Sequence, residues 1–172
     1  IARKPLARVA TADILLLCVK PKDIGQLCES IKGDLKPGSV IVSVAAGKTI
    51  EGIQAIVGPS VGIIRVMPNT PTFIGKGAAG ISVGENVSED LLKFVQGFLA
   101  ASGIVIRVNE DLQPAVTAMS GSGPAYFFAF VEAMIAGGIK LGLSESDATA
   151  LAHQTIVGAA GMLEQTGKSA QE

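Results

Sequence analysis

The chain has 172 residues, which is enough for one ordinary domain or two small ones. Apolar residues make up 48% of it and the net charge is −1, so it has neither the basic surface that attracts nucleic acid nor a polybasic membrane-binding segment. Its two cysteines, Cys18 and Cys28, and its single histidine, His153, argue against a disulfide framework and a transition-metal site. We expect reduced thiols, a cytoplasmic protein, no nucleic-acid partner and no bound metal.

Neither end of the chain has the character of a targeting segment. The start, IARKPLARVA, has no apolar core of a signal peptide and no initiator Met, and the end, EQTGKSAQE, stops in mid-pattern. We therefore expect both ends to be cut. Residues 125–143 come closest to a membrane span, but Glu132 and Lys140 interrupt them. This segment predicts a helix buried in an interface and no membrane partner.

The first part of the chain alternates between strand-like and helix-like patterns. The apolar run DILLLCV, residues 13–19, predicts a strand buried on both faces, as in a parallel sheet. Thr49 and Ser88 are the expected N-caps of two helices. Strands are predicted at 13–19, 39–44, 62–67, 79–83 and 104–108, and helices at 2–12, 22–34, 50–57 and 89–101. Short links between them predict an open α/β sheet with right-handed crossovers.

The pattern changes after residue 108. Helices are predicted at 110–119, 124–141 and 144–165, and no further strand is expected. Ser144, with Asp147 three residues later, resembles a capping box. The sequence therefore predicts two domains, an α/β domain over 1–108 and an all-helical domain over 109–172.

The segment 119–142 combines a small-residue turn with a long apolar helix. Ser120 to Gly123 form the expected turn, and Pro124 follows at a natural first helical position, with Ser122 or Gly123 as N-cap. Backbone N–H groups at such a helix start suit an anionic ligand, although a plain helix cap explains the same residues. The helix itself is apolar on nearly all faces and must be covered by something.

Unusual residues follow three of the predicted strands, at 19–21, 45–47 and 67–71. Ligands of open α/β sheets bind outside the carboxyl ends of the strands. Lys20 is suited to face a phosphate or to be a solvated surface lysine. The small residues 45–47 allow a flat ring or a phosphate to approach the backbone, or form a plain loop. Asn69, held between two prolines, is suited equally to a ligand contact and to a structural hydrogen bond.

Other catalytic signatures are weak. The chain has no P-loop, and no G-x-G-x-x-G opens a strand-helix unit. His153 has no Ser, Cys or Asp motif beside it, so we interpret it as a structural or surface residue.

Five motifs in a fixed order make the chain similar to a known family. They are CVKPKDI, SVAAGKTIEGI, IRVMPNTPTFIGKGAAG, NEDLQPAVTAMSGSGP and TAMSGSGPAYFFAFVEAMIAGGIKLGL. Together, over nearly all 172 residues, they resemble pyrroline-5-carboxylate reductase. The resemblance implies reduction of 1-pyrroline-5-carboxylate to proline, the last step of proline biosynthesis, with NADPH or NADH.

The resemblance also implies a Rossmann-like α/β domain followed by a helical domain that interleaves into homodimers and larger oligomers. Ala129, Ala133 and Gly137 recur every four residues, which makes one face of the predicted helix suited to close packing. Packing within one chain explains the same face, but the resemblance favours a role between subunits.

Site residues are implied by the resemblance at the matching positions. The cofactor-binding residues would be Val19, Lys20 and Pro21 along the phosphate and ribose, with Ala45, Ala46, Gly47 and Asn69 near the nicotinamide. The substrate pocket would contain Thr70, Glu110, Ser120, Gly121, Ser122 and Gly123. No catalytic residue is assigned. Residues 110–116 depart from the family pattern E-D-x-x-D-A-V at one position, where Pro114 replaces the second aspartate. Pro114 lies in the first turn of its predicted helix, where proline is tolerated.

The family implies two further segments, a glycine-rich dinucleotide loop before Ile1 and a Ser-Pro-Gly-Gly-Thr segment after Glu172. We therefore expect the 172-residue polypeptide alone to be inactive. One alternative is a relative of 3-hydroxyacid dehydrogenases, which carry a catalytic lysine here, but residues 109–139 contain no lysine. A non-catalytic dinucleotide-binding dimer is the other alternative, and it stays open.

Overall fold

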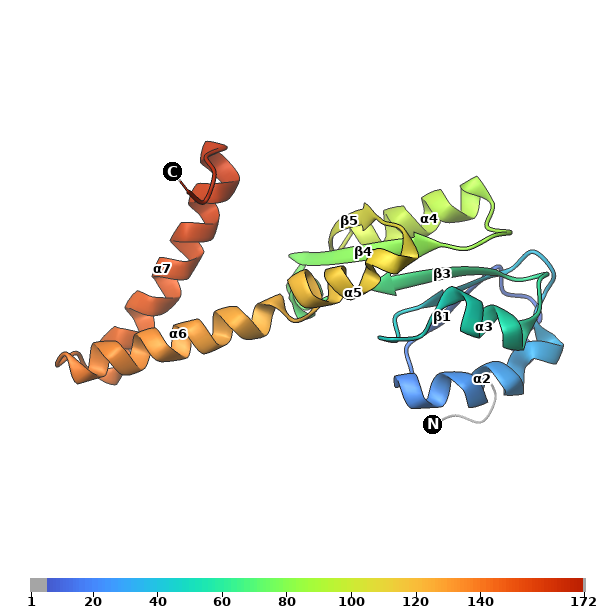
Figure 1. Ribbon diagram of the computed structural model, residues 1–172, viewed down its shortest axis with the longest axis horizontal. Helices are drawn as coiled ribbons and strands as arrows, with labels where there is room; N and C mark the ends of the chain where they lie inside the picture. The colour runs from blue at the N-terminus through green and yellow to red at the C-terminus, as the bar shows by residue number, and fades with distance from the viewer. Residues whose placement is uncertain (1–5, 172) are drawn as a thin grey trace. The chain divides into compact units, whose positions relative to one another are not determined.

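The computed structural model describes residues 6–171 and divides the chain into two compact units, Ile1–Ser122 and Gly123–Glu172 (Figure 1). The strands of the first unit are β1 (Ile14–Leu17), β2 (Val40–Ser43), β3 (Gly62–Met67), β4 (Gly77–Val83) and β5 (Gly103–Arg107). Its longer helices are α2 (Ile24–Ile31), α3 (Ile50–Val57) and α4 (Glu89–Ala100). Of the first predicted helix, α1 (Leu6–Val9) is observed, and residues 2–5 lie outside the described part.

The sheet has the sequential order β1-β2-β3-β4-β5 and is mixed. Strands β1, β2 and β3 are parallel, β4 runs antiparallel to β3, and β5 is parallel to β4. The expectation of crossovers throughout is therefore wrong between β3 and β4. Residues 68–76 join these strands through the short 3₁₀ helix Thr70–Ile74, which is too short for the crossover that a parallel pair needs.

Two apolar cores hold the first unit together, one on each face of the sheet (Figure 1). On one face α2 and α3 pack against residues such as Ile41 and Ile63. On the other face α4 packs against residues such as Ile64 and Ile81. The predicted N-caps are confirmed: Thr49 Oγ1 accepts from Gly52 N at 3.0 Å and Ser88 Oγ accepts from Leu91 N at 3.3 Å.

Strand β1 is less buried than its sequence predicts. Only Leu17 of this strand is buried, and 44% of Leu16 is exposed, whereas β2 is buried at every position. Within the described residues β1 pairs only with β2, so it forms an edge of the sheet. The prediction of burial on both faces, made for residues 13–19, is therefore wrong for β1.

A helical segment after β5 packs as part of the first unit. It comprises the 3₁₀ turn Glu110–Leu112, α5 (Gln113–Val116) and the π-helical turn Thr117–Gly121. Gly80 of β4 leaves room for Val116: a Cβ at Gly80 would lie 2.7 Å from Val116 Cγ1. The two compact units therefore divide after Ser122, C-terminal to the boundary predicted from the sequence.

The second unit is a helical hairpin of α6 (Gly123–Lys140) and α7 (Glu145–Thr166). Gly138 lets α6 approach α7, since a Cβ there would lie 3.1 Å from Ala148 Cβ. Ser144 caps α7, as predicted, by accepting from Asp147 N at 3.1 Å. Most of the apolar side chains on α6 are exposed, among them Tyr126, Phe127, Phe128 and Phe130.

By length and composition alone, the stretch Glu110–Lys140 is apolar enough to cross a membrane, and 6% of its most apolar window is buried. The core of a soluble helical protein satisfies the same test. The absence of a membrane partner stays a prediction.

Candidate functional site

The carboxyl ends of three parallel strands meet at one edge of the sheet. The register aligns Leu17 of β1 with Ser43 of β2, and Ser43 with Arg65 of β3. Because β4 is antiparallel to β3, its amino end, Gly77, lies at the same edge. All three strand-end segments predicted to bind a ligand, 19–21, 45–47 and 67–71, therefore start from this edge.

Residues 19–21 form the first of these segments. Lys20 is extended (φ −62°, ψ 150°), and Pro21 opens the 3₁₀ turn Pro21–Asp23. The turn is closed by Asp23 N, which donates to the carbonyl of Lys20 at 2.9 Å. Val19 and Lys20 are exposed, and within residues 6–171 Lys20 forms no ion pair. Its ammonium group is thus available to an anion from solution.

Residues 45–47 bend the chain from β2 into α3. Ala45 is buried and its N–H donates to Ser43 Oγ at 3.4 Å. Gly47 has a φ of +72°, which favours glycine, and open space surrounds the position of its missing Cβ. The turn therefore exposes backbone at Gly47 and leaves room above it.

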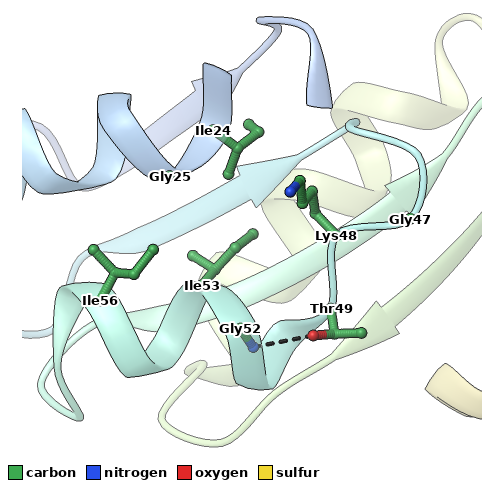
Figure 2. A pocket seen from close by; sticks show the side chains of 8 residues that line it. All are labelled: Ile24, Gly25, Gly47, Lys48, Thr49, Gly52, Ile53 and Ile56. Atoms are coloured by element: carbon green, nitrogen blue, oxygen red, sulfur yellow. Dashed lines mark hydrogen bonds between the residues drawn. The ribbon is translucent and has the colours of Figure 1, made fainter. Parts of the chain in front are cut away.

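A hollow of 260 Å³ lies beside Gly47, between α2 and α3 (Figure 2). Figure 2 shows Ile24 of α2 opposite Ile53 and Ile56 of α3, with Thr49 bonded to Gly52 at the start of α3. Lys48, Thr49 and Gly25 complete the lining. Sequence reasoning did not assign these residues to the site, although Lys48 and Thr49 directly follow a predicted segment.

Asn69 is bonded within the protein at both ends of its side-chain amide. Its Oδ1 accepts from Ala78 N at 2.9 Å, and its Nδ2 donates to the carbonyl of Ser120 at 3.1 Å. Pro124, four residues after Ser120, has no N–H to donate to that carbonyl in the usual α-helical pattern, and the Asn69 amide donates to it. These bonds favour the structural interpretation of Asn69. Thr70 is exposed and opens the 3₁₀ helix Thr70–Ile74.

The predicted small-residue turn at 120–123 joins a π-helical turn to α6, which begins at Gly123. Thr117–Gly121 is a π-helical turn, and Ser122 N donates to the carbonyl of Thr117 at 2.8 Å. Ser120 Oγ donates back to the carbonyl of Val116 at 3.0 Å. Ser122 is in the right-handed helical region and its N–H is already bonded, so it does not have the extended backbone of a usual N-cap. The start of α6 at Gly123 agrees with the sequence, and anion binding at this turn stays a prediction.

Glu110 lies at the amino end of α3. Its Oε1 accepts from Ile50 N at 2.8 Å and from Arg65 Nη1 at 3.0 Å. The Arg65 side chain is 9% exposed and that of Glu110 is 29% exposed. Sequence reasoning assigned Glu110 to the substrate pocket but missed Arg65. The sequence feature that could have identified Arg65 is that it is a single arginine inside the apolar strand IIRVM.

A second buried polar group lies next to this pair in the sheet. Ser82 of β4 is in register with Arg65, and its hydroxyl donates to the carbonyl of Val108 at 3.0 Å. Gln113, fully buried, donates through Nε2 to Ser82 Oγ at 2.9 Å. These bonds fasten the segment after β5 to β4, close to where Glu110 meets Arg65.

The predicted site residues do not share one cavity in the described part of the chain. Gly47 lines the hollow of Figure 2, whereas Glu110 lines a 580 Å³ hollow on the β4 side of α3. Ser120 lines an apolar groove of 410 Å³ between β4, β5 and residues 112–120. Gly123 belongs to the second unit.

The site offers binding groups and no metal centre. Within residues 6–171 no group of three or more His, Cys, Asp or Glu side chains is placed to hold a metal ion. Backbone at Gly47, the Lys20 ammonium and the Glu110 carboxylate are arranged around the carboxyl edge. Such groups bind and orient an organic ligand, and a bound cofactor would have to supply redox chemistry.

Two family models match the sequence. Residues 110–172 match the one described as pyrroline-5-carboxylate reductase dimerisation, and residues 3–47 match the one described as NADP oxidoreductase, coenzyme F420-dependent. The pyrroline-5-carboxylate reductase of Corynebacterium melassecola is 42% identical over 164 residues, which are 94% of this chain and 61% of that relative.

Solved structures are similar as well. A pyrroline-5-carboxylate reductase of Coxiella burnetii matches with a TM-score of 0.90 and 36% identity, over 98% of this chain and 63% of that one. A Plasmodium falciparum pyrroline carboxylate reductase with NADP bound matches with a TM-score of 0.86 and 33% identity, over 92% and 60%. The chain spans about three fifths of the length of these relatives. The predicted fold class, a Rossmann-like unit followed by a helical one, is confirmed, and the 3-hydroxyacid dehydrogenase alternative is not favoured.

Proposed function

We propose that the chain is a member of the pyrroline-5-carboxylate reductase family and that it provides the dinucleotide side of an NAD(P)H-dependent imine reductase. The proposed reaction is hydride transfer to 1-pyrroline-5-carboxylate to give L-proline. The observation that carries the proposal is the common carboxyl edge of β1, β2 and β3, with Gly47 in a left-handed conformation at that edge.

The residues at this edge fit a nicotinamide dinucleotide. Lys20 offers a positive charge to a phosphate, and Ala45, Ala46 and Gly47 offer a turn without bulky side chains. When bound, the nicotinamide supplies the hydride. Val19 and Pro21 would flank the dinucleotide, and the protein's own task is to bind and orient it and the imine.

We propose that some residues of the pocket contact the substrate and that Asn69 holds part of the pocket in place. Thr70, Glu110, Ser120, Gly121, Ser122 and Gly123 are the proposed substrate-side residues. Asn69 belongs near the nicotinamide in this proposal, as a residue that holds the turn at Ser120, because both ends of its amide are bonded inside the protein. A Cβ at Gly121 would lie 2.6 Å from Met67 Cε, so this turn packs closely on the flexible end of Met67.

We also propose that the chain forms a homodimer through the second unit. In support, the matching family model for 110–172 is described as a dimerisation region, and the aromatic side chains of α6 are exposed. Gly137, with nothing within 4 Å of its missing Cβ, leaves an open small-residue face beside Ala133. On this proposal a second copy, and not lipid, covers the apolar stretch. Of the two proposed domains, 1–108 and 109–172, the second would begin with residues 109–122, which pack on β4 of the first.

Dinucleotide binding at the edge is tested with two matched glycine variants of the 172-residue chain. Gly47 and Gly38 have similar φ values, +72° and +79°, and both have open space at Cβ, but Gly38 precedes β2 at the opposite edge. Both Gly47→Val and Gly38→Val strain the backbone. We expect Gly47→Val to weaken NADPH or NADH binding about tenfold or more, and Gly38→Val to leave the Kd unchanged. Equal Kd values for the two variants, in a fluorescence titration, would contradict the proposed place of the cofactor.

Catalysis is tested by assaying NAD(P)H oxidation with 1-pyrroline-5-carboxylate. The 172-residue chain is expected to be inactive. A chimera with its residues 6–171 in place of the matching segment of the Corynebacterium melassecola relative is expected to be active. An inactive but folded chimera that binds the dinucleotide would support the non-catalytic alternative. The ratio of kcat/KM values for NADPH and NADH in the chimera would establish the cofactor preference.

A further inference from the structure

We propose that Arg65 is a positioning residue for the dinucleotide site and that it acts through Glu110 on the amino end of α3. The inference rests on the proposed function for the identity of the ligand. The role of Arg65 itself rests on the contacts of the described residues.

Arg65 lies on the buried strand β3, and its side chain is 9% exposed. A guanidinium stays charged, so burying it is costly unless a carboxylate or comparable acceptor pairs with it. Glu110 is its only ion-pair partner among residues 6–171, with Nη1 and Oε1 3.0 Å apart. The strand therefore fixes the position of the Glu110 carboxylate.

The same oxygen of Glu110 also accepts from Ile50 N, the first N–H of α3, at 2.8 Å. The first N–H groups of a helix have no partner inside the helix, and the helix dipole favours a negative charge beside them. Thr49 takes a second of these donors by accepting from Gly52 N at 3.0 Å. One carboxylate oxygen thus joins β3, the segment after β5 and the start of α3.

The turn 45–47 is held by one hydrogen bond at its start and by another shortly after its end. At its start, Ala45 N donates to Ser43 Oγ on β2. Only Lys48 and Thr49 separate its end, Gly47, from Ile50. Loss of the bond between Arg65 and Glu110 would free the carboxylate from Ile50 N and loosen the turn that the dinucleotide must approach.

Arg65 is almost completely buried and does not line the hollows that contain Gly47, Ser120 and Glu110. We therefore expect an effect of its substitution on ligand affinity to pass through Glu110. If the ion pair served only stability, its removal would lower the melting temperature. It would change neither the ligand affinity of the folded chain nor the hydrogen exchange of the Ile50 amide.

The experiment compares Arg65→Met, Arg65→Lys and Glu110→Gln in the 172-residue chain. Arg107→Met, a substitution of an exposed arginine on β5, is the control. NMR hydrogen exchange reports on the Ile50 amide, and fluorescence titration gives the Kd for NADPH and NADH. We expect Arg65→Met to speed Ile50 exchange and raise the Kd, each about tenfold, because a charge-assisted hydrogen bond is lost.

Arg65→Lys keeps the charge and should restore part of both effects. The double variant Arg65→Met/Glu110→Gln should be no worse than the more severe single variant, because both changes remove one interaction. If Arg65→Met fails to fold, the two conservative variants carry the same comparison with Arg107→Met.

Ile50 exchange in Arg65→Met equal to that in the control would overturn the inference. Faster exchange with an unchanged Kd would overturn it too, since Arg65 would then order α3 without affecting the ligand. If the unaltered chain binds neither NADPH nor NADH, the Kd values are measured for the same variants in the chimera described above. A chimera that binds neither dinucleotide contradicts the proposed function, whereas a Kd in Arg65→Met equal to that of the control contradicts the role of Arg65.

Discussion

Ile64 of β3 and Phe128 of α6 are both large apolar residues, but Ile64 is fully buried and 69% of Phe128 is exposed. The difference extends to the units that contain them. The first unit covers both faces of its sheet with helices, whereas α6 and α7 bury only a few small or aliphatic side chains, such as Val131 and Ala152. A sheet flanked by helices completes its own core, but a two-helix hairpin that is apolar all round does not.

The largest expected effect concerns the two units as separate polypeptides. Residues 1–122 should fold cooperatively on their own. Residues 123–172 should be largely unfolded when dilute, because a domain below about 70–80 residues rarely gains more than 3–5 kcal/mol from its core. Circular dichroism as a function of concentration measures both. A hairpin peptide that is monomeric and melts cooperatively would refute the contrast between the units.

Single substitutions sharpen the same contrast. Ile64→Ala should destabilise the chain by about 2–5 kcal/mol, because it leaves a cavity in a closed core. Phe128→Ala should change the unfolding free energy of the monomer by less than about 1 kcal/mol but weaken self-association, because its ring is exposed. Chemical denaturation and sedimentation measure the two effects. A large loss of monomer stability in Phe128→Ala would show that α6 buries this ring within one chain.

A smaller effect tests whether the segment after β5 is truly part of the first unit. Gly80→Ala should cost about 1–3 kcal/mol, because its Cβ would meet the stiff side chain of Val116 at 2.7 Å. Adding Val116→Ala should recover part of this loss. Gly121→Ala is the comparison, since its Cβ meets only the flexible end of Met67 and should cost less. Additive effects of Gly80→Ala and Val116→Ala, in denaturation experiments, would contradict the packing.

The smallest effect is chemical, without loss of stability. Cys28 lies on the buried face of α2, and burial, with the Glu29 carboxylate beside it, raises the pKa of the Cys28 thiol. The thiolate is the reactive form, so Cys28 should stay unmodified by a thiol reagent near neutral pH while the exposed Cys18 reacts. Mass spectrometry of the labelled native chain gives the order of reaction. Early labelling of Cys28 would mean that this core opens readily.

Local signals predicted most elements of the first unit. The strand Gly62–Met67 and the helix Ile50–Val57 begin and end where the sequence indicates, and Thr49 and Ser88 cap their helices. These features depend on neighbouring residues, through apolar periodicity and capping hydrogen bonds. The direction of β4 depends instead on how the chain returns after Met67, which strand propensity alone does not encode.

The candidate site, like the fold, was only partly predictable from local sequence. Sequence motifs predicted ligand-binding segments at three strand ends, and the parallel register of β1, β2 and β3 brings these segments to one edge of the sheet. No local pattern shows that Asn69 bonds to Ser120, 51 residues away, or that Arg65 pairs with Glu110, 45 residues away. Such contacts form only when the chain has folded.

By itself, then, the sequence determined the resemblance to a reductase family, the order of the elements and the residues at the strand ends, because motifs and short-range periodicity carry that information. Tertiary structure alone decided that Asn69 bonds to the carbonyl of Ser120 and that a buried arginine holds Glu110 at the start of α3. The physical reason is that a buried charge or a buried carbonyl without a helical donor must form a hydrogen bond. Its partner is a residue that only the fold brings within hydrogen-bond distance.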